Sequence, residues 1–317
     1  MLLRMRALLG LLVLALTPAI AADSDYNGRW DITPTLQRPR GWWLELKGVG
    51  TSNAEGSFVS AYAGDLNKVS EISVDNGQLK FVIVQPGNQK NGPNRFVYHA
   101  HLMGGKLMGT MEREGQKGEP TKWMGVRAPA IDEVDDASWK SGKPVELFNG
   151  KDLSGWHALM TEQEMKWSVV DGVLRNAPPT TDIVSDRKFW NFTAHIEFKI
   201  REHSNSGIGL RGRYEIQILD DYGKEPNSHG AGALYSRVVP AVNASKPVGE
   251  WQTYDIRLVG RTVTVVFNGK KVLDKVHVDG LTAIANNADE GEPGPFIVQG
   301  DHSYVEIRKF IVTPLMK

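Results

Sequence analysis

The sequence contains no cysteine and has no net charge. Without cysteine there are no disulfides, thiol nucleophiles or thiolate metal sites, and no lipid attached through cysteine. Acidic and basic residues number 37 each, so the chain lacks the basic footprint of a nucleic-acid-binding protein. Beyond the N-terminus, no apolar run approaches the roughly 20 residues that span a bilayer. We therefore expect a soluble protein without a membrane span or a nucleic-acid partner, stabilised by core burial.

Residues 1–22 have the order of a secretory signal peptide. Arg4 and Arg6 precede an apolar run from Ala7 to Leu16, and small residues follow up to Ala22. This order of basic, apolar and small residues is typical of a cleaved export signal. It predicts a periplasmic or secreted protein.

The mature chain of nearly 300 residues exceeds the usual size of one domain. An acidic stretch without periodicity suggests a linker over residues 129–143. It would separate an accessory β-domain (23–128) from a second domain (144–317). Both parts contain short strand-like runs divided by turn pairs such as Asn76-Gly77 and Asn268-Gly269.

Almost no segment has the period of an amphipathic helix, so the sequence predicts an all-β fold. For the first domain, the sequence predicts a small β-barrel or sandwich. In the second domain, strands at this spacing predict a two-sheet β-sandwich, or jelly roll.

The segment from Ser204 to Tyr222 concentrates polar residues in two strand-like runs. Because strand side chains alternate between faces, Tyr214, Ile216 and Ile218 point one way, and Glu215 and Gln217 the other. Glu215 and Gln217 are then neighbours on one surface. The alternative is an ordinary solvated face of an antiparallel sheet.

Seven segments of the second domain carry a family resemblance. They are Val145–Trp156, Trp167–Leu174, Ser204–Gly207, Tyr214–Asp220, Gly232–Tyr235, Gly249–Tyr254 and Val298–His302. In order and spacing they resemble the 3-keto-disaccharide hydrolase domain family over about residues 144–314. The resemblance implies a concanavalin-like jelly roll with a sugar site on its concave face. It also implies action on glycosides oxidised to a ketone at C3.

The C3 ketone of such a substrate acidifies the neighbouring C2 proton. Cleavage by elimination then needs a base for that proton, a donor for the enolate oxygen and an acid for the departing oxygen. For the base the candidates are His302 and Glu215, because either group can titrate near neutral pH. Arg211 is the candidate for the keto oxygen. The alternatives are a solvated loop histidine at His302 and a structural ion pair of Arg211 with Glu215 or Asp220.

Further polar residues are candidates for binding the sugar. They are Gln217, Asp220, Tyr235, Glu197, Lys199 and Asp301. Asp220 has turn capping as an alternative role, and Glu197 and Lys199 reach substrate only if their strand lies in the concave sheet. Glu215, Asp220, His229, Asp301 and His302 are residue types that bind divalent cations. A divalent cation is therefore possible, but no compact motif assigns its ligands.

The leading hypothesis is an exported 3-keto-glycoside hydrolase or lyase, which requires a sugar 3-oxidoreductase to supply its substrate. A non-catalytic carbohydrate-binding module is the alternative, because fold does not decide function. A laminarinase-type glycosidase is disfavoured, because Gln217 stands where its second carboxylate belongs.

Overall fold

The computed structural model describes residues 21–60, 64–87 and 92–317. The all-β prediction is confirmed: apart from one short 3-10 helix, the regular elements of this part of the chain are strands. In chain order the elements are η1 (Asp23–Tyr26), β1 (Gly28–Pro34), β2 (Trp42–Lys47), β3 (Glu55–Val59), β4 (Asn67–Asp75), β5 (Gln78–Gln85), β6 (Asn94–Met103), β7 (Lys106–Arg113), β8 (Thr121–Arg127), β9 (Lys140–Ser141), β10 (Val145–Glu146), β11 (Trp156–Ala158), β12 (Trp167–Val170), β13 (Val173–Asn176), β14 (Ile183–Phe189), β15 (Phe192–Ile200), β16 (Asn205–Leu210), β17 (Tyr214–Leu219), β18 (Gln252–Val259), β19 (Thr262–Phe267), β20 (Lys270–His277), β21 (Gly294–Val298) and β22 (Val305–Met316).

Strands β1 to β8 form a closed antiparallel barrel in which β8 pairs back with β1. Between β4 and β5, Asn76 and Gly77 have φ values of 49° and 72°. Two successive positive φ values match the twist of a two-residue hairpin, which explains the Asn-Gly pair there. The barrel interior is aromatic, with Phe81 and Tyr98 stacked at 4.6 Å between ring centroids.

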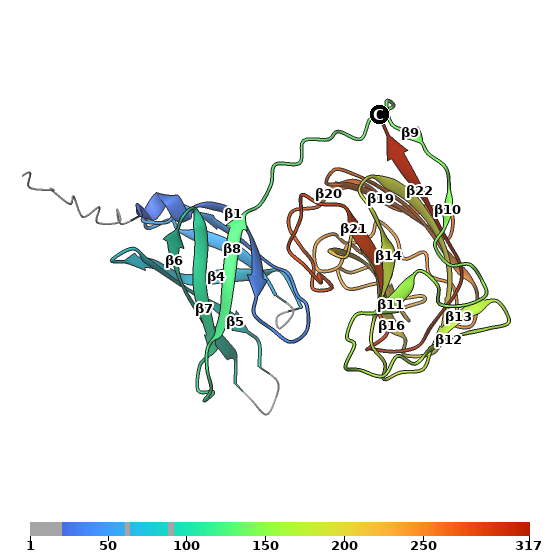
Figure 1. The fold of residues 1–317 in the computed structure, drawn as a ribbon, viewed down its shortest axis with the longest axis horizontal. Helices are drawn as coiled ribbons and strands as arrows, with labels where there is room; N and C mark the ends of the chain where they lie inside the picture. Colours follow the sequence, from blue (N-terminus) through green and yellow to red (C-terminus); the bar gives the residue numbers. More distant parts are fainter. Residues whose placement is uncertain (1–20, 61–63, 88–91) are drawn as a thin grey trace, which may run out of the picture.

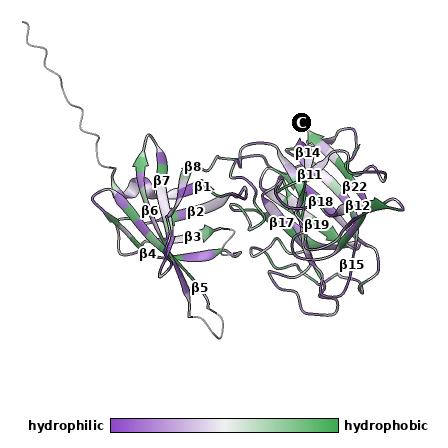
Figure 2. Cartoon of the chain, turned by 60° about the horizontal axis from the view of Figure 1, so that its bottom comes forward, coloured by the Kyte–Doolittle hydropathy of each residue, from purple (hydrophilic) through white to green (hydrophobic). Residues whose placement is uncertain are grey.

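The second domain is a sandwich of two antiparallel sheets, as a jelly roll requires. The nine-stranded sheet runs β12-β13-β22-β15-β18-β19-β20, with β9 and β10 paired to β22. The five-stranded sheet runs β11-β14-β21-β16-β17. Alternating burial along β15 places Ala194, Ile196 and Phe198 in the core. Apolar and polar stretches interchange along the strands of both domains (Figure 2).

The barrel and the sandwich lie side by side, joined by an extended segment between β8 and β9 (Figure 1). Trp43 and Val59 of the barrel belong to the same buried apolar cluster as the sandwich core. The Trp43 ring packs on Gly280 of the sandwich, where an added Cβ would lie 2.3 Å from ring atoms. The two domains therefore share an apolar contact.

The predicted signal peptide falls almost wholly on residues 1–20, outside the described residues. Within the described ranges, no helix has the length and apolar character needed to cross a membrane.

Gly280→Ala is expected to lower stability by ~2–4 kcal/mol, because the methyl group overlaps Trp43 and a φ of 70° strains a side-chain-bearing residue. Gly104→Ala is the matched control. Gly104 has a φ of 58° but open space around it, so only the backbone cost of ~1–2 kcal/mol applies. Urea unfolding followed by tryptophan fluorescence compares the two variants. If the two variants lost the same free energy of unfolding, tight packing of Trp43 on Gly280 would be contradicted.

Candidate active site

Glu215 and Gln217 project from β17 on the face of the five-stranded sheet opposite the sandwich core. Their neighbours Tyr214 and Ile216 point into the core, as the alternation predicts. Both polar side chains are nevertheless buried, each with 3% of its surface exposed. This face is therefore covered, unlike the solvated face that was the alternative.

The Glu215 carboxyl lies over Gly207 of the neighbouring strand β16. A Cβ at Gly207 would stand 2.4 Å from Glu215 Oε1, so only glycine leaves room for the carboxyl. No hydrogen bond or ion pair from the described residues reaches this carboxyl. Burial raises the pKa of Glu215 to about 8, with smaller effects from His302, Asp182 and Asp301. Among the described residues the carboxyl thus has no partner, and burial moves its pKa toward neutral pH.

Asp182, Asp301 and His302 form a connected group within electrostatic range of Glu215. Asp182 Oδ1 accepts the backbone N–H of Gly300 at 2.9 Å and of Asp301 at 3.3 Å. His302 Nδ1 donates to Asp301 Oδ1 at 2.5 Å. This hydrogen bond raises the pKa of His302 against the opposing effect of burial. The imidazole is therefore oriented through Nδ1, which leaves Nε2 for another partner.

Burial disfavours the charged form of Asp301, but hydrogen bonds from His302 and Arg38 outweigh it and lower its pKa. Asp182 behaves in the opposite way. Its burial, together with the charge of Asp301, raises its pKa. The pKa values of these two neighbouring carboxyls are thus shifted in opposite directions. Such opposed shifts are common at functional sites.

Gln217 and Tyr235 lie beside Glu215. Gln217 Nε2 donates to the carbonyl of His229 at 3.2 Å, whereas its buried Oε1 has no partner among the described residues. The backbone N–H of Tyr235 donates to the carbonyl of Glu215 at 3.0 Å. Burial, with the charge of Glu215, raises the pKa of the Tyr235 phenol to about 12. Both side chains have hydrogen-bonding atoms suited to sugar hydroxyls.

Arg211 lies outside this group. It occupies the turn between β16 and β17 with a φ of 52°. Its guanidinium donates to the carbonyls of Trp190 and Gly260 and to Asn191 Oδ1, and lies 3.8 Å from the Trp190 ring centroid. Neither of the ion pairs considered for Arg211, with Glu215 or with Asp220, forms.

Glu197, Lys199 and Asp220 are also placed apart from Glu215. Glu197 and Lys199 lie on β15 in the nine-stranded sheet, where Lys199 Nζ pairs with Glu306 at 2.6 Å. Asp220 follows β17, and its Oδ2 accepts the backbone N–H of His203 at 2.9 Å. That contact joins Asp220 to the turn between β15 and β16.

The site contains residues that the sequence did not indicate. Asp182 precedes β14, and Arg38 and Arg40 come from the connection between β1 and β2 of the barrel. Arg38 donates to Asp182 at 2.6 Å and to Asp301 at 2.8 Å. No local signal marks these residues, since Arg38 and Asp301 are 263 positions apart.

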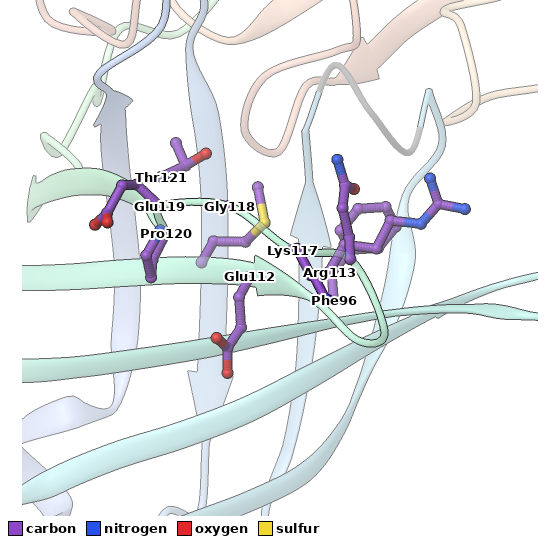
Figure 3. A pocket seen from close by; sticks show the side chains of 10 residues that line it. Phe96, Glu112, Arg113, Lys117, Gly118, Glu119, Pro120 and Thr121 are labelled. Atoms are coloured by element: carbon purple, nitrogen blue, oxygen red, sulfur yellow. The ribbon is translucent and has the colours of Figure 1, made fainter.

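Among the described residues, no group of three or more His, Asp or Glu side chains is arranged to hold a metal ion. A separate cavity of about 180 Å³ lies on the barrel between the ends of β7 and β8, lined by side chains that include Glu112, Lys117 and Glu119 (Figure 3). None of the predicted site residues lines it.

The raised pKa of Glu215 predicts a stability effect of known sign. Between the ordinary pKa of 4.5 and about 8, the folded state binds more protons than the unfolded state, so stability falls as pH rises through this window. Glu215→Gln removes that loss. At pH 8.5 the variant should be more stable than the parent by ~1–3 kcal/mol, and at pH 5 the two should be similar.

Glu306→Gln is the control for this effect. Glu306 is also buried, but hydrogen bonds from Lys199 and Tyr304 outweigh burial and lower its pKa. Its neutral replacement should therefore lose stability at pH 8.5. Urea titrations at both pH values make the comparison. If Glu215→Gln were no more stable than its parent at pH 8.5, the raised pKa of the buried Glu215 carboxyl would be refuted.

Comparison with known proteins places the sandwich in a family. A "3-keto-disaccharide hydrolase" of Bacteroides thetaiotaomicron is 25% identical over 167 residues, which are 41% of this chain and 57% of that relative. The chain thus spans little more than half the length of that relative. A solved Parabacteroides distasonis protein, assigned to the glycosyl hydrolases, is 27% identical with a TM-score of 0.47, and the match covers 58% of this chain and 93% of that one. The sequence model of the 3-keto-alpha-glucoside-1,2-lyase-like domain matches residues 143–313, more than half of the chain, and the protein therefore belongs to this family.

Proposed function

We propose that this protein is an exported enzyme that cleaves 3-keto-glycosides by elimination, with water addition giving net hydrolysis. The observation that carries the proposal is the buried Glu215 carboxyl, which has no partner in the part of the chain that the structure describes and lies within electrostatic range of the Asp301–His302 pair. Membership of the 3-keto-alpha-glucoside-1,2-lyase-like family supports the choice of a keto sugar. The export signal at residues 1–22 supports a periplasmic or secreted location.

In the first step, the ionised Glu215 carboxylate removes the C2 proton. The C–H bonding electrons form the C2–C3 double bond and leave negative charge on the C3 oxygen. A carboxylate with a pKa of about 8 is a stronger base than an ordinary one, and it is still ionised in part at neutral pH. Burial thus supplies the basicity that this step needs.

In the second step, the enolate re-forms the C3 carbonyl, a C1–C2 double bond forms and the C1–O bond breaks. The leaving oxygen needs a proton, which His302 supplies from Nε2. The hydrogen bond to Asp301 raises the pKa of His302, which favours the protonated ring that this step needs. Water then adds across the C1–C2 double bond, with hydroxyl at C1 and a proton at C2, and yields the free 3-keto sugar.

Gln217 and Tyr235 bind the sugar in this scheme. The buried Oε1 of Gln217 accepts a substrate hydroxyl, since no described residue pairs with it. A C3 ketone is not present in ordinary glycosides. The reaction therefore requires a sugar 3-oxidoreductase upstream, which supplies the keto substrate.

The purified mature protein is expected to release the aglycone from a 3-keto-glucoside and to leave the unoxidised glucoside intact, because only the ketone acidifies C2. Mass spectrometry follows the aglycone and the glycal, with and without a chelator. Loss of cleavage in chelator would assign a cation to the reaction. Binding of both sugars without cleavage of either would instead indicate a carbohydrate-binding module.

Glu215→Gln and His302→Ala should each lower turnover by about two orders of magnitude or more, but in different steps. Glu215→Gln should stop exchange of the C2 proton with deuterated solvent, whereas His302→Ala should retain it. A p-nitrophenyl leaving group needs no proton, so it should restore His302→Ala and not Glu215→Gln. The opposite pattern would exchange the two roles, and full activity in both variants would rule out this site.

A further inference from the structure

The connection between β1 and β2 of the barrel reaches onto the sandwich beside Glu215. The backbone N–H of Gly41 donates to the carbonyl of Ala285 at 3.0 Å, and Arg40 donates to the carbonyl of Ala283 at 3.3 Å. A Cβ at Gly41 would lie 2.2 Å from the carbonyl oxygen of Asn287. The same sandwich segment contains Thr282, whose hydroxyl accepts the backbone N–H of Glu215 at 2.9 Å. The barrel connection therefore packs against the segment that fixes Glu215.

Arg38 of this connection bonds to two carboxylates at once. One arm of its guanidinium donates to Asp182 and the other to Asp301, at 2.6 Å and 2.8 Å. Asp182 is 2% exposed and Asp301 22% exposed. Two carboxylates this close repel each other in a partly dry environment, and a planar guanidinium between them offsets that repulsion with fixed geometry.

The contacts of Arg38 continue to the imidazole. Asp301 accepts from Arg38 through Oδ2 and from His302 Nδ1 through Oδ1. Asp182 meanwhile holds the backbone at Gly300 and Asp301. Arg38 of the barrel thus holds the carboxylate that bonds His302 directly, and it holds the backbone at Asp301 through Asp182.

We infer that the barrel is a working part of the active site and that Arg38 is a positioning residue, which holds Asp301 and thereby orients His302. The expected effect of Arg38 on catalysis rests on the proposed function. Its effect on the orientation of the His302 ring does not. Arg40 adds a second positive charge from the same connection, and its charge opposes the burial that raises the pKa of Glu215.

The test compares Arg38→Ala and Arg38→Lys with Arg29→Ala in the full chain. Arg29 is a matched control because it also pairs across the two domains, with Asp279 at 3.0 Å, and has no contact with Asp182 or Asp301. Arg38→Ala should lower kcat for a 3-keto-glucoside by about 100-fold with little change in KM. Lysine should restore only part of the rate, because one ammonium cannot reproduce the fork. Added guanidinium ion should rescue Arg38→Ala and not Arg38→Lys.

A second readout needs no activity. The ring ¹⁵N shifts of His302, assigned by their loss in His302→Ala, report which nitrogen carries the proton and whether Nδ1 is hydrogen-bonded. They should change in Arg38→Ala and stay unchanged in Arg29→Ala, when both are measured at a temperature at which each variant is folded.

The outcomes separate the two proposals. If the parent protein cleaves no keto-glycoside but Arg38→Ala alters the His302 shifts, the proposed function fails and the positioning role stands. If the parent cleaves the substrate and Arg38→Ala matches Arg29→Ala in both rate and shifts, the positioning role is overturned. A rate loss accompanied by unfolding of Arg38→Ala and Arg38→Lys alike, with unchanged shifts in the folded fraction, would also overturn it.

Discussion

The raised pKa of Glu215 depends on keeping one face of the five-stranded sheet dry. In a sandwich of antiparallel sheets, one face of each sheet packs in the core and the other usually meets water. Here the outer face carries Glu215, which is only 3% exposed. The segment around Thr282 bonds to its backbone, and the barrel connection docks on that segment. Because burial is what raises the pKa of Glu215 to about 8, the basicity of this group depends on the cover of this face.

Burial of several carboxyls is unfavourable, because their charged forms lose hydration and repel one another. Glu215, Asp182 and Asp301 are three carboxyls within electrostatic range of one another. Two solutions occur together. Burial raises the pKa of Glu215 and of Asp182, whereas hydrogen bonds from His302 and Arg38 outweigh burial and lower the pKa of Asp301. A buried carboxylate is tolerated where charged hydrogen-bond donors offset its desolvation, as Arg38 and His302 do for Asp301.

The sequence predicted local features of the site and missed the long-range ones. Alternation along β17 correctly placed Glu215 and Gln217 on one face, because the period of a strand is fixed by backbone geometry. The same rule does not extend into a turn. Arg211 adopts a positive φ there, and its guanidinium turns toward Trp190. For Glu197 the alternation was also sound, but which sheet contains β15 depends on its pairing with β18 and β22, which no local pattern encodes. Arg38 meets Asp301 across 263 positions, so only the docked domains reveal it.

The contact between the domains has an apolar part and a charged part, and the two contribute differently to stability. Apolar groups dominate one part of it, where Trp43 packs on Gly280 and Val59 joins the sandwich core. Burying one large apolar side chain contributes about 1.5–3 kcal/mol, whereas an exposed ion pair such as Arg29–Asp279 contributes about 0–1 kcal/mol. The apolar contact therefore contributes more to docking than the exposed Arg29–Asp279 pair does. Because the apolar contact does not involve Arg38, substitution of Arg38 is expected to alter His302 without undocking the barrel.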